Sequence, residues 1–490
     1  MTQLSLTKGV VQEITEFIQR LFLEDEVPWV VGYSGGKDST ATLQLVWYAL
    51  ASLSADQRNR KTVYVISTDT LVEQPVVARW VSEAHDLIRR ASVEQDMPIV
   101  PHRLTPKTKD TYWVNLLGRG YPAPRQTFRW CTSRLKIAPS NSFILNVLKS
   151  HGEAVLVLGI RKAESSRRSA IMSRHESRRT RDYLSPNASL PNSQVFSPIE
   201  SWSNDDVWLY LMQYQNPWGR SNKALMQMYR GASLDNDCPI ILDTTTPSCG
   251  SSRFGCWVCT LVSVDRSMEA MIQNDGEKVW MTPLLDLRNE IGVLGSDGAI
   301  DDRDRRDYRR MDGSLKLKAD QAIHGPYTKR WREYLLRRLL GTQEEIRRLS
   351  PGPAGDIVLI TPEELREIRR IWVQEKHEFD DTLPGLYEEM TGCPYPFKDD
   401  LQPHSFSRSE WELLEELCEG DHVRLDMLAS MIDLAQKSRE SIVRKPIKQE
   451  LEGIIRRCFY ESEEDAVAFH RHRSHLRGSL LIQEDPDGQA

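Results

Sequence analysis

The chain has 490 residues, and its 64 Lys and Arg against 70 Asp and Glu give a net charge of −6. This length exceeds the size at which one hydrophobic core stops growing, so we expect two or three domains. The acidic balance excludes a surface that is basic throughout. The absence of long apolar runs and of a signal-like N-terminus predicts a cytoplasmic protein with no membrane partner.

Short β-branched runs alternate with amphipathic stretches over the first 200 residues. This alternation predicts an α/β fold with a parallel sheet and helices on both faces. The expected strands are 29–33, 62–67, 98–103, 154–160 and 194–199, and the clearest expected helices are 38–51 and 74–94.

The composition changes twice along the chain. We expect a nucleotide-binding domain over 1–230, a Cys-rich segment over 231–265 and a mainly helical region over 266–490. Capping-box patterns at Thr361–Glu364 and Ser407–Glu410 predict helix starts in the last region. A Gly, Asp and Arg-rich stretch at about 295–325 suggests a mobile loop, and the last dozen residues suggest a disordered tail.

A phosphate-binding loop is predicted where the first strand meets the first long helix. The loop consists of Ser34, Gly35, Gly36, Lys37, Asp38 and Ser39. A helix N-terminus at the carboxyl end of a parallel strand attracts anions, and paired glycines let the backbone approach phosphate oxygens. The two serines can donate hydrogen bonds, Lys37 can neutralise charge and Asp38 suits a magnesium ion.

The loop is not a Walker A motif, because Asp38 stands where that motif has Ser or Thr and Val31 stands where it has its first glycine. It resembles the Ser-Gly-Gly-x-Asp-Ser loop of the adenine nucleotide α-hydrolase, or PP-loop, superfamily. That resemblance implies ATP binding and release of pyrophosphate instead of a single phosphate.

Two further segments are expected at the same edge of the sheet. Asp69 ends the second strand and is a candidate for nucleotide or metal contact, or for a simple helix cap. Arg161 follows the fourth strand in a segment resembling the Gly-x-Arg-x-x-Glu-Ser-x-x-Arg pattern of the sulfonucleotide reductases, and we expect it to bind phosphate. Eight Lys or Arg against three acids over 161–182 form either a local positive surface or a solvated charge run.

Eight cysteines are too few for a disulfide scaffold in a chain of this length. Four of them lie within 22 residues, namely Cys238, Cys249, Cys256 and Cys259. Their irregular spacing favours a [4Fe-4S] cluster over zinc. A fifth, Cys131, lies among three cations that are expected to lower its pKa, which suits either a persulfide carrier or a buried structural thiol.

Several blocks together resemble the DndC family, the sulfurtransferases of bacterial DNA phosphorothioate modification. The blocks are 32–40, 68–75, 120–125, 129–132 and the four cysteines. The resemblance implies an ATP pyrophosphatase that uses ATP, Mg²⁺ and a [4Fe-4S] cluster to activate a DNA phosphate oxygen by adenylation for replacement by sulfur. It implies Lys37, Asp38, Arg161 and Cys131 as catalytic residues, and DNA, other Dnd subunits and a cysteine desulfurase as partners.

Other functions remain open on the sequence. A sulfonucleotide reductase shares the loop and the Arg161 segment, but its reactive C-terminal cysteine has no counterpart in 477–490. An RNA thiolation enzyme shares the loop and the cluster. A non-catalytic scaffold would bind ATP and metal without turnover. Basic tracks for nucleic acid are expected at 161–181 and 329–338.

Overall fold

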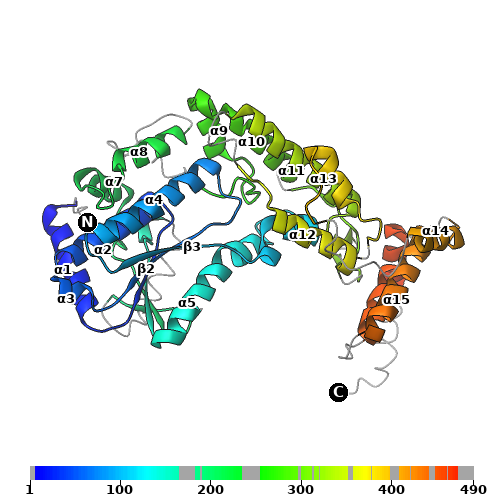
Figure 1. Ribbon diagram of the computed structural model, residues 1–490, viewed down its shortest axis with the longest axis horizontal. Coiled ribbons are helices and arrows are strands. Elements are labelled where there is room, and N and C mark those ends of the chain that lie inside the picture. Colours follow the sequence, from blue (N-terminus) through cyan, green and yellow to red (C-terminus); the bar gives the residue numbers. More distant parts are fainter. Residues whose placement is uncertain are drawn as a thin grey trace, which may run out of the picture. The chain divides into compact units, whose positions relative to one another are not determined.

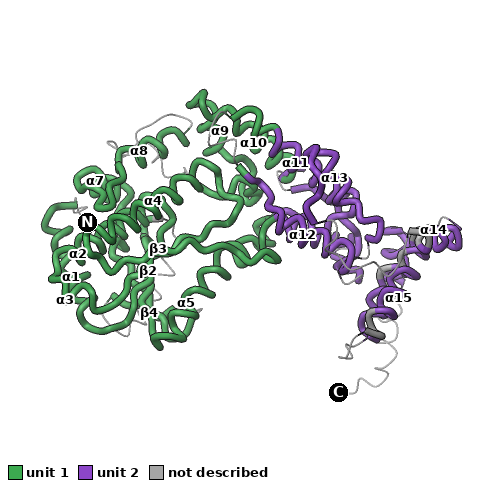
Figure 2. Tube along the Cα trace, in the orientation of Figure 1, with its two compact units in different colours: residues 1–112, 124–291, 345–357 green, residues 113–123, 292–344, 358–490 purple. Residues whose placement is uncertain are grey.

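The computed structural model describes residues 6–164, 183–187, 190–233, 254–295, 300–311, 314–318, 321–350, 357–376, 378–397, 408–419, 421–440, 447–460 and 462–472. The chain forms two compact units (Figure 2). Unit 1 comprises 1–112, 124–291 and 345–357, and unit 2 comprises 113–123, 292–344 and 358–490. Among the described residues, no helix has the length and apolar character needed to cross a bilayer.

Unit 1 is built on a six-stranded sheet in the order β3-β2-β1-β4-β6-β5. Its strands are β1 (Trp29–Gly32), β2 (Val63–Thr68), β3 (Ile99–Leu104), β4 (Ala154–Val157), β5 (Ser185–Pro186) and β6 (Ser193–Phe196). All neighbours pair in parallel except β5, which is antiparallel to β6. The predicted α/β class is confirmed, and each of the five expected strands is present, with β4 and β6 shorter than expected.

Helices cover both faces of this sheet, with α2 (Lys37–Ala51) and α4 (Pro75–Glu94) on one side and α5 (Ala138–His151) on the other (Figure 1). Alternate β1 residues explain the two layers. Trp29 and Val31 belong to the larger core, whereas Val30 packs with Ile144 of α5 in a smaller one. The strand is therefore apolar on both faces, as expected for a buried parallel strand.

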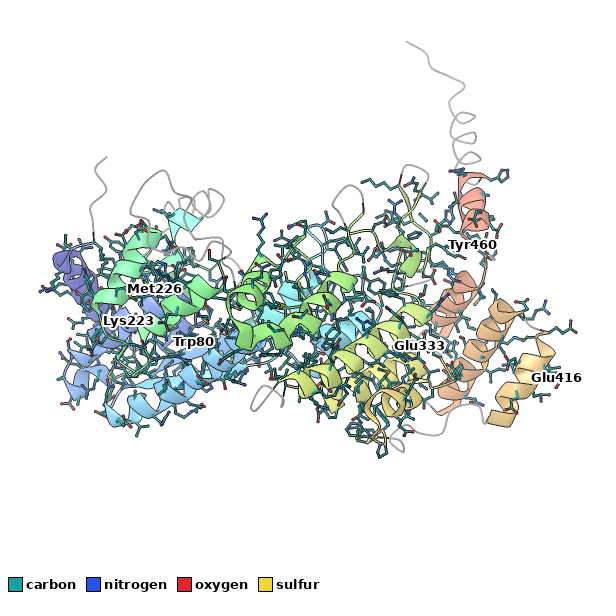
Figure 3. The ribbon with its side chains drawn as sticks, turned by 90° about the horizontal axis from the view of Figure 1, so that it is seen from above. Trp80, Lys223, Met226, Glu333, Glu416 and Tyr460 are labelled. Carbon is teal, nitrogen blue, oxygen red and sulfur yellow. The ribbon has the colours of Figure 1, made fainter. Side chains whose placement is uncertain are left out.

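The remaining helices of unit 1 surround this sheet or follow it in the chain. They are α1 (Lys8–Leu23), α3 (Ala55–Arg58), α7 (Asn204–Gln213), α8 (Asn222–Gly231), α9 (Arg266–Asn274) and α10 (Thr282–Ile291). In Figure 3, Trp80 is labelled on α4 and Met226 on α8, and both side chains pack against the larger core. Because α9 and α10 belong to unit 1, the change of unit falls near residue 291, beyond the boundary at 266 that composition suggested.

Unit 2 is mainly helical, as the sequence indicated. It contains most of α11 (Lys329–Leu349), then α12 (Pro362–Arg370), α13 (Leu383–Thr391), α14 (Arg408–Leu417), α15 (His422–Glu440) and α16 (Ile447–Arg457). The predicted capping box is present at Thr361, whose side chain accepts from the Glu364 N–H while the Glu364 carboxylate accepts from the Thr361 N–H. The second box begins at Ser407, which lies outside the described residues, and α14 begins at the next residue.

The segment expected to be a mobile loop, 295–325, contains ordered hydrogen bonding where it is described. Asp302 is 1% exposed and accepts a hydrogen bond from the Tyr327 hydroxyl at 3.0 Å and from Arg306 at 3.1 Å. Two short strands, β7 (Leu317–Lys318) and β8 (Gln321–Ala322), form an antiparallel pair. Buried side-chain partners therefore organise a stretch whose composition alone suggested flexibility.

Candidate nucleotide and thiol site

The phosphate loop, residues 34–39, joins β1 to α2 as predicted. Gly36 is the N-cap of α2, and Gly35 has φ of +74°, a conformation that favours glycine. A Cβ at Gly35 would lie 2.7 Å from a methyl group of Val81, so space as well as conformation requires glycine there. The first amides of α2 and its positive dipole end thus lie at the carboxyl end of a central strand, where anions bind.

The two loop serines contact each other in this structure. The Ser39 hydroxyl accepts from the Ser34 N–H at 3.1 Å, lies 3.1 Å from the Ser34 hydroxyl and donates to the Gly36 carbonyl at 3.0 Å. These contacts hold the turn in shape. Their predicted use as phosphate donors stays a prediction.

An ion-pair network joins the loop to Arg161. One oxygen of Asp38 lies 3.0 Å from the Lys37 ammonium and the other lies 2.6 Å from Arg161 Nε. Arg161 is 4% exposed and also donates to the Trp202 carbonyl at 3.3 Å. The structure therefore brings Arg161 to the adjacent residues Lys37 and Asp38, although more than a hundred residues separate them in the chain. A carboxylate beside two cations is the kind of group that an anion and metal site requires.

Asp69 lies after β2, next to β1, but its carboxylate is engaged locally. One oxygen accepts from the Leu71 N–H at 2.8 Å and the other pairs with Arg103 at 2.6 Å. Asp69 does not cap α4, which begins at Pro75. Its candidate role in nucleotide binding stays a prediction, and the contacts shown here stabilise the turn after β2.

The Cys256-x-x-Cys259 pair lies against that same turn. Trp257 N–H donates to the Val72 carbonyl at 2.9 Å, and the Cys256 thiol shares a hydrogen bond with the Thr70 hydroxyl at 3.3 Å. Burial raises the pKa of Cys256 to about 11, and nearby Lys136 opposes that rise. The thiol pair is thereby placed at the carboxyl edge of the sheet that also carries the phosphate loop.

Cys131 joins this thiol group, although 125 residues separate it from Cys256 in the chain. Its thiol interacts electrostatically with that of Cys259, and both interact with Lys136. The expectation that neighbouring cations lower the pKa of Cys131 was wrong, because burial raises it. Arg129 bonds to Gln126 and Arg134 pairs with Asp110 at 2.8 Å, so two of the three expected cations are engaged elsewhere.

The proposed metal ligands are only partly described. Cys238 and Cys249 lie outside the described residues, and within those residues no three His, Cys, Asp or Glu side chains are arranged to hold a metal ion. Thiolates at Cys131, Cys256 and Cys259 have the donor chemistry that zinc or an iron–sulfur cluster requires. The ligand set and the identity of the metal thus stay predictions.

Two groups near the thiols were missed from the sequence. Burial, followed by the charge of Asp69, raises the pKa of Glu73 to about 7, and Glu73 forms a backbone bridge with Cys256. Buried Arg288 on α10 donates to the carbonyls of Cys259, Val262 and Ser263, and so holds the loop that follows the thiol pair. Glu73 lies in the block 68–75 but had no role assigned there, and Arg288 belongs to no short motif, so only the fold reveals these contacts.

A basic stretch was also missed, although it is visible in the sequence. Residues 103–149 contain nine Lys or Arg and a single acid, Asp110. The expected track at 161–181 lies outside the described residues after Glu164. The track on α11 is largely neutralised, because Lys329, Arg332 and Arg337 pair with Asp380, Glu378 and Glu389 respectively.

Unit 1 thus combines a mostly parallel α/β sheet with a glycine-containing turn at the N-terminus of α2. Residues 28–261 match the family model of the phosphoadenosine phosphosulfate reductase domain. This part of the chain accordingly has the α/β fold of a phosphoadenosine phosphosulfate reductase-like domain.

The chain is also similar to individual proteins. It is 27% identical over 204 residues to the uncharacterized protein MJ0066 of Methanocaldococcus jannaschii, a match that covers 42% of this chain and 35% of that protein. Two solved structures are similar in part. One is the phosphoadenylyl-sulfate reductase from Candida auris in a phosphate complex, at 12% identity and a TM-score of 0.27, covering 46% of this chain and 93% of that one. The other is the U34-tRNA thiolase NcsA from Methanococcus maripaludis with its [4Fe-4S] cluster, at 11% identity and a TM-score of 0.29, covering 58% and 78%.

Proposed function

We propose that this protein is the ATP-dependent sulfurtransferase of DNA phosphorothioate modification. The observation that carries the proposal is the gathering of a phosphate loop and three thiols at one edge of one sheet. Lys37, Asp38 and Arg161 form the charged part of that site, and Cys256 lies beside the turn that follows the neighbouring strand β2. Few reactions need bound triphosphate and thiol sulfur together, and activation of an oxygen for replacement by sulfur is one of them.

In the proposed reaction a DNA phosphate oxygen attacks the α-phosphorus of ATP and pyrophosphate leaves. Sulfur from a persulfide then attacks the DNA phosphorus, and AMP leaves with the original oxygen. A second thiol would then attack the carrier sulfur, form a disulfide with the carrier cysteine and release the DNA phosphorothioate, and an external thiol reductant would reduce that disulfide. Lys37 and Arg161 would balance the charge that develops on the phosphates. When these two cations pair with the nucleotide, the carboxylate of Asp38 would be released to hold Mg²⁺. A cysteine desulfurase would supply the sulfur, and other Dnd subunits would complete the assembly.

The thiols fit a resident cluster by their donor chemistry. A [4Fe-4S] cluster held by Cys238, Cys249, Cys256 and Cys259 would supply redox chemistry or labile sulfide. The chain's own contribution is to order the thiol-bearing loop through Arg288 and to place Lys136 near the thiols. Cys131, whose thiol interacts electrostatically with that of Cys259, remains the candidate carrier of persulfide sulfur.

DNA as the acceptor is supported by charge. The basic stretch 103–149 contains Cys131 and contributes Lys136 near the thiols, in a protein whose net charge is −6. A phosphate backbone gains affinity from such a local concentration of Lys and Arg. RNA would be attracted by the same charges, and a competing proposal is therefore thiolation of RNA.

The test measures pyrophosphate release from ATP by protein purified without oxygen, with DNA, with RNA and with neither. The proposal predicts release with DNA that is lost in Lys37→Ala and Asp38→Ala and kept in Lys8→Ala, an exposed lysine on α1 outside the basic stretch. Broad absorbance near roughly 400 nm would accompany a cluster. Stimulation by RNA alone would favour RNA thiolation, and ATP binding without release under all three conditions would favour a scaffold.

A further inference from the structure

Tyr229, near the end of α8, lies directly against the phosphate loop. Its hydroxyl accepts a hydrogen bond from the Lys37 backbone N–H at 3.3 Å, and the Lys37 ammonium lies 5.5 Å from the centre of its ring. A Cβ at Gly36 would approach the same hydroxyl to 3.1 Å. Asp38 and Arg161 both act electrostatically on Tyr229. The Tyr229 hydroxyl therefore already accepts the hydrogen bond of one α2 backbone N–H that an anion would use.

The Tyr229 ring also contacts the thiol-bearing segment. Phe254 packs edge-on against Tyr229, with ring centres 4.7 Å apart and planes at 77°. Phe254 is two residues before Cys256, in a stretch whose Trp257 N–H is held by the Val72 carbonyl. A continuous series of contacts thus runs from the Lys37 amide through two aromatic rings to the segment that carries Cys256.

We propose that Tyr229 is a positioning residue that holds the Lys37 amide in the absence of nucleotide, yields it to a phosphate oxygen when ATP binds, and passes the displacement through Phe254 to the Cys256 segment. The physical reason is a difference between acceptors. A charged phosphate oxygen makes a stronger hydrogen bond to a backbone N–H than a neutral phenol does, so the phosphate displaces the hydroxyl. This inference rests on the proposed function for the identity of its ligand, ATP.

The first experiment compares the affinity for α,β-methylene ATP in the full chain and in Tyr229→Phe. The substitution keeps the ring and removes only the competing acceptor. Because one net hydrogen bond no longer has to be broken, we expect binding that is about two- to tenfold tighter. Tyr48→Phe is the matched control, since its hydroxyl donates to the Gln215 carbonyl at 2.7 Å, and it should leave the affinity unchanged. Equal or weaker binding by Tyr229→Phe overturns the proposal.

The second experiment measures hydrogen exchange over 254–259 with and without the same analogue. Exchange there should rise on binding in the unaltered chain, because the Tyr229 ring leaves Phe254, while exchange over the phosphate loop falls. In Phe254→Leu the affinity should persist and the rise should be absent. Unchanged exchange in the unaltered chain overturns the relay. Failure of the unaltered chain to bind the analogue overturns both this inference and the ATP step of the proposed function, whereas binding without the expected differences overturns this inference alone.

Discussion

Replacing Arg288 by Met tests whether one buried side chain maintains the loop after the thiol pair. Its guanidinium donates to the Cys259 carbonyl at 3.0 Å, to the Ser263 carbonyl at 2.8 Å and to the Val262 carbonyl, and the residue is 1% exposed. Each hydrogen bond contributes about 1 kcal/mol net to the stability of the folded state. A carbonyl that loses its donor and is not reached by water destabilises the folded state by more than that. The loop side chains at 262–264 are exposed, so water can replace part of the loss. We expect destabilisation by about 2–4 kcal/mol.

Urea unfolding followed by fluorescence measures this loss, and hydrogen exchange over 259–263 locates it. Exchange there should rise in Arg288→Met well before global unfolding, because the loop loses its three anchors. The control is Arg89→Met, whose ion pair with Asp86 is exposed and should contribute no more than about 0.5 kcal/mol. A loss below about 1 kcal/mol with unchanged exchange would refute the reasoning, since the carbonyls would then be satisfied without the guanidinium.

Two further predictions concern the sheet around the phosphate loop. Burial lowers the pKa of His85 to about 4, and its Nδ1 has no hydrogen-bond partner among the described residues. The folded state should therefore lose about 3 kcal/mol of stability as pH falls from about 6.5 through 4. Urea midpoints across this range should show that slope, and His85→Asn should flatten it. A Cβ at Gly159 would lie 2.7 Å from the backbone carbonyl oxygen of Asp38, so Gly159→Ala should destabilise by about 2 kcal/mol and weaken nucleotide binding. Gly231→Ala, with open space around it, should not change either quantity, and equal effects of the two substitutions would contradict the steric argument.

Local pattern was enough to predict much of unit 1. The β-branched run 29–33 followed by paired glycines identified strand, loop and helix together, because turn chemistry and helix start are encoded within ten residues. The rule that parallel strands share a carboxyl edge also predicted that Arg161 would lie near the loop, and the structure places it 2.6 Å from Asp38. Such rules do not predict which groups a side chain contacts in the folded protein.

Cys131 illustrates that limit. Counting adjacent cations predicted a lowered pKa, but neighbours in sequence need not be neighbours in space. Arg134 pairs with Asp110 instead of the thiol. Burial, which depends on the whole fold, has the largest effect on the pKa of Cys131. The insertion of 113–123 into unit 2 was likewise not predicted, because no change of composition marks it.

The cation that does act on the thiols, Lys136, offers a direct test of their electrostatics. Cys256 is the main cause of the raised pKa of Lys136, and Lys136 in turn opposes the raised pKa of Cys256, whereas its effect on Cys131 is smaller. Lys136→Met should therefore slow alkylation of Cys256 by iodoacetamide in chelator-treated protein and move its pH midpoint upward, with less change at Cys131. Lys149→Met, a matched change on the same helical segment, should have no effect.

The salt dependence of the alkylation rate is a second test of the effect of Lys136 on the thiols. Lys136 is exposed, so added salt should screen its charge and bring the unaltered chain toward the rate of Lys136→Met. Peptide mass spectrometry separates modification at Cys256 from modification at Cys131. Equal slowing at both thiols, or a rate at Cys256 that is unchanged by either the substitution or salt, would mean that Lys136 does not set the charge around the thiols. The thiolate needed for sulfur transfer would then have to be stabilised by a bound metal or by a partner subunit.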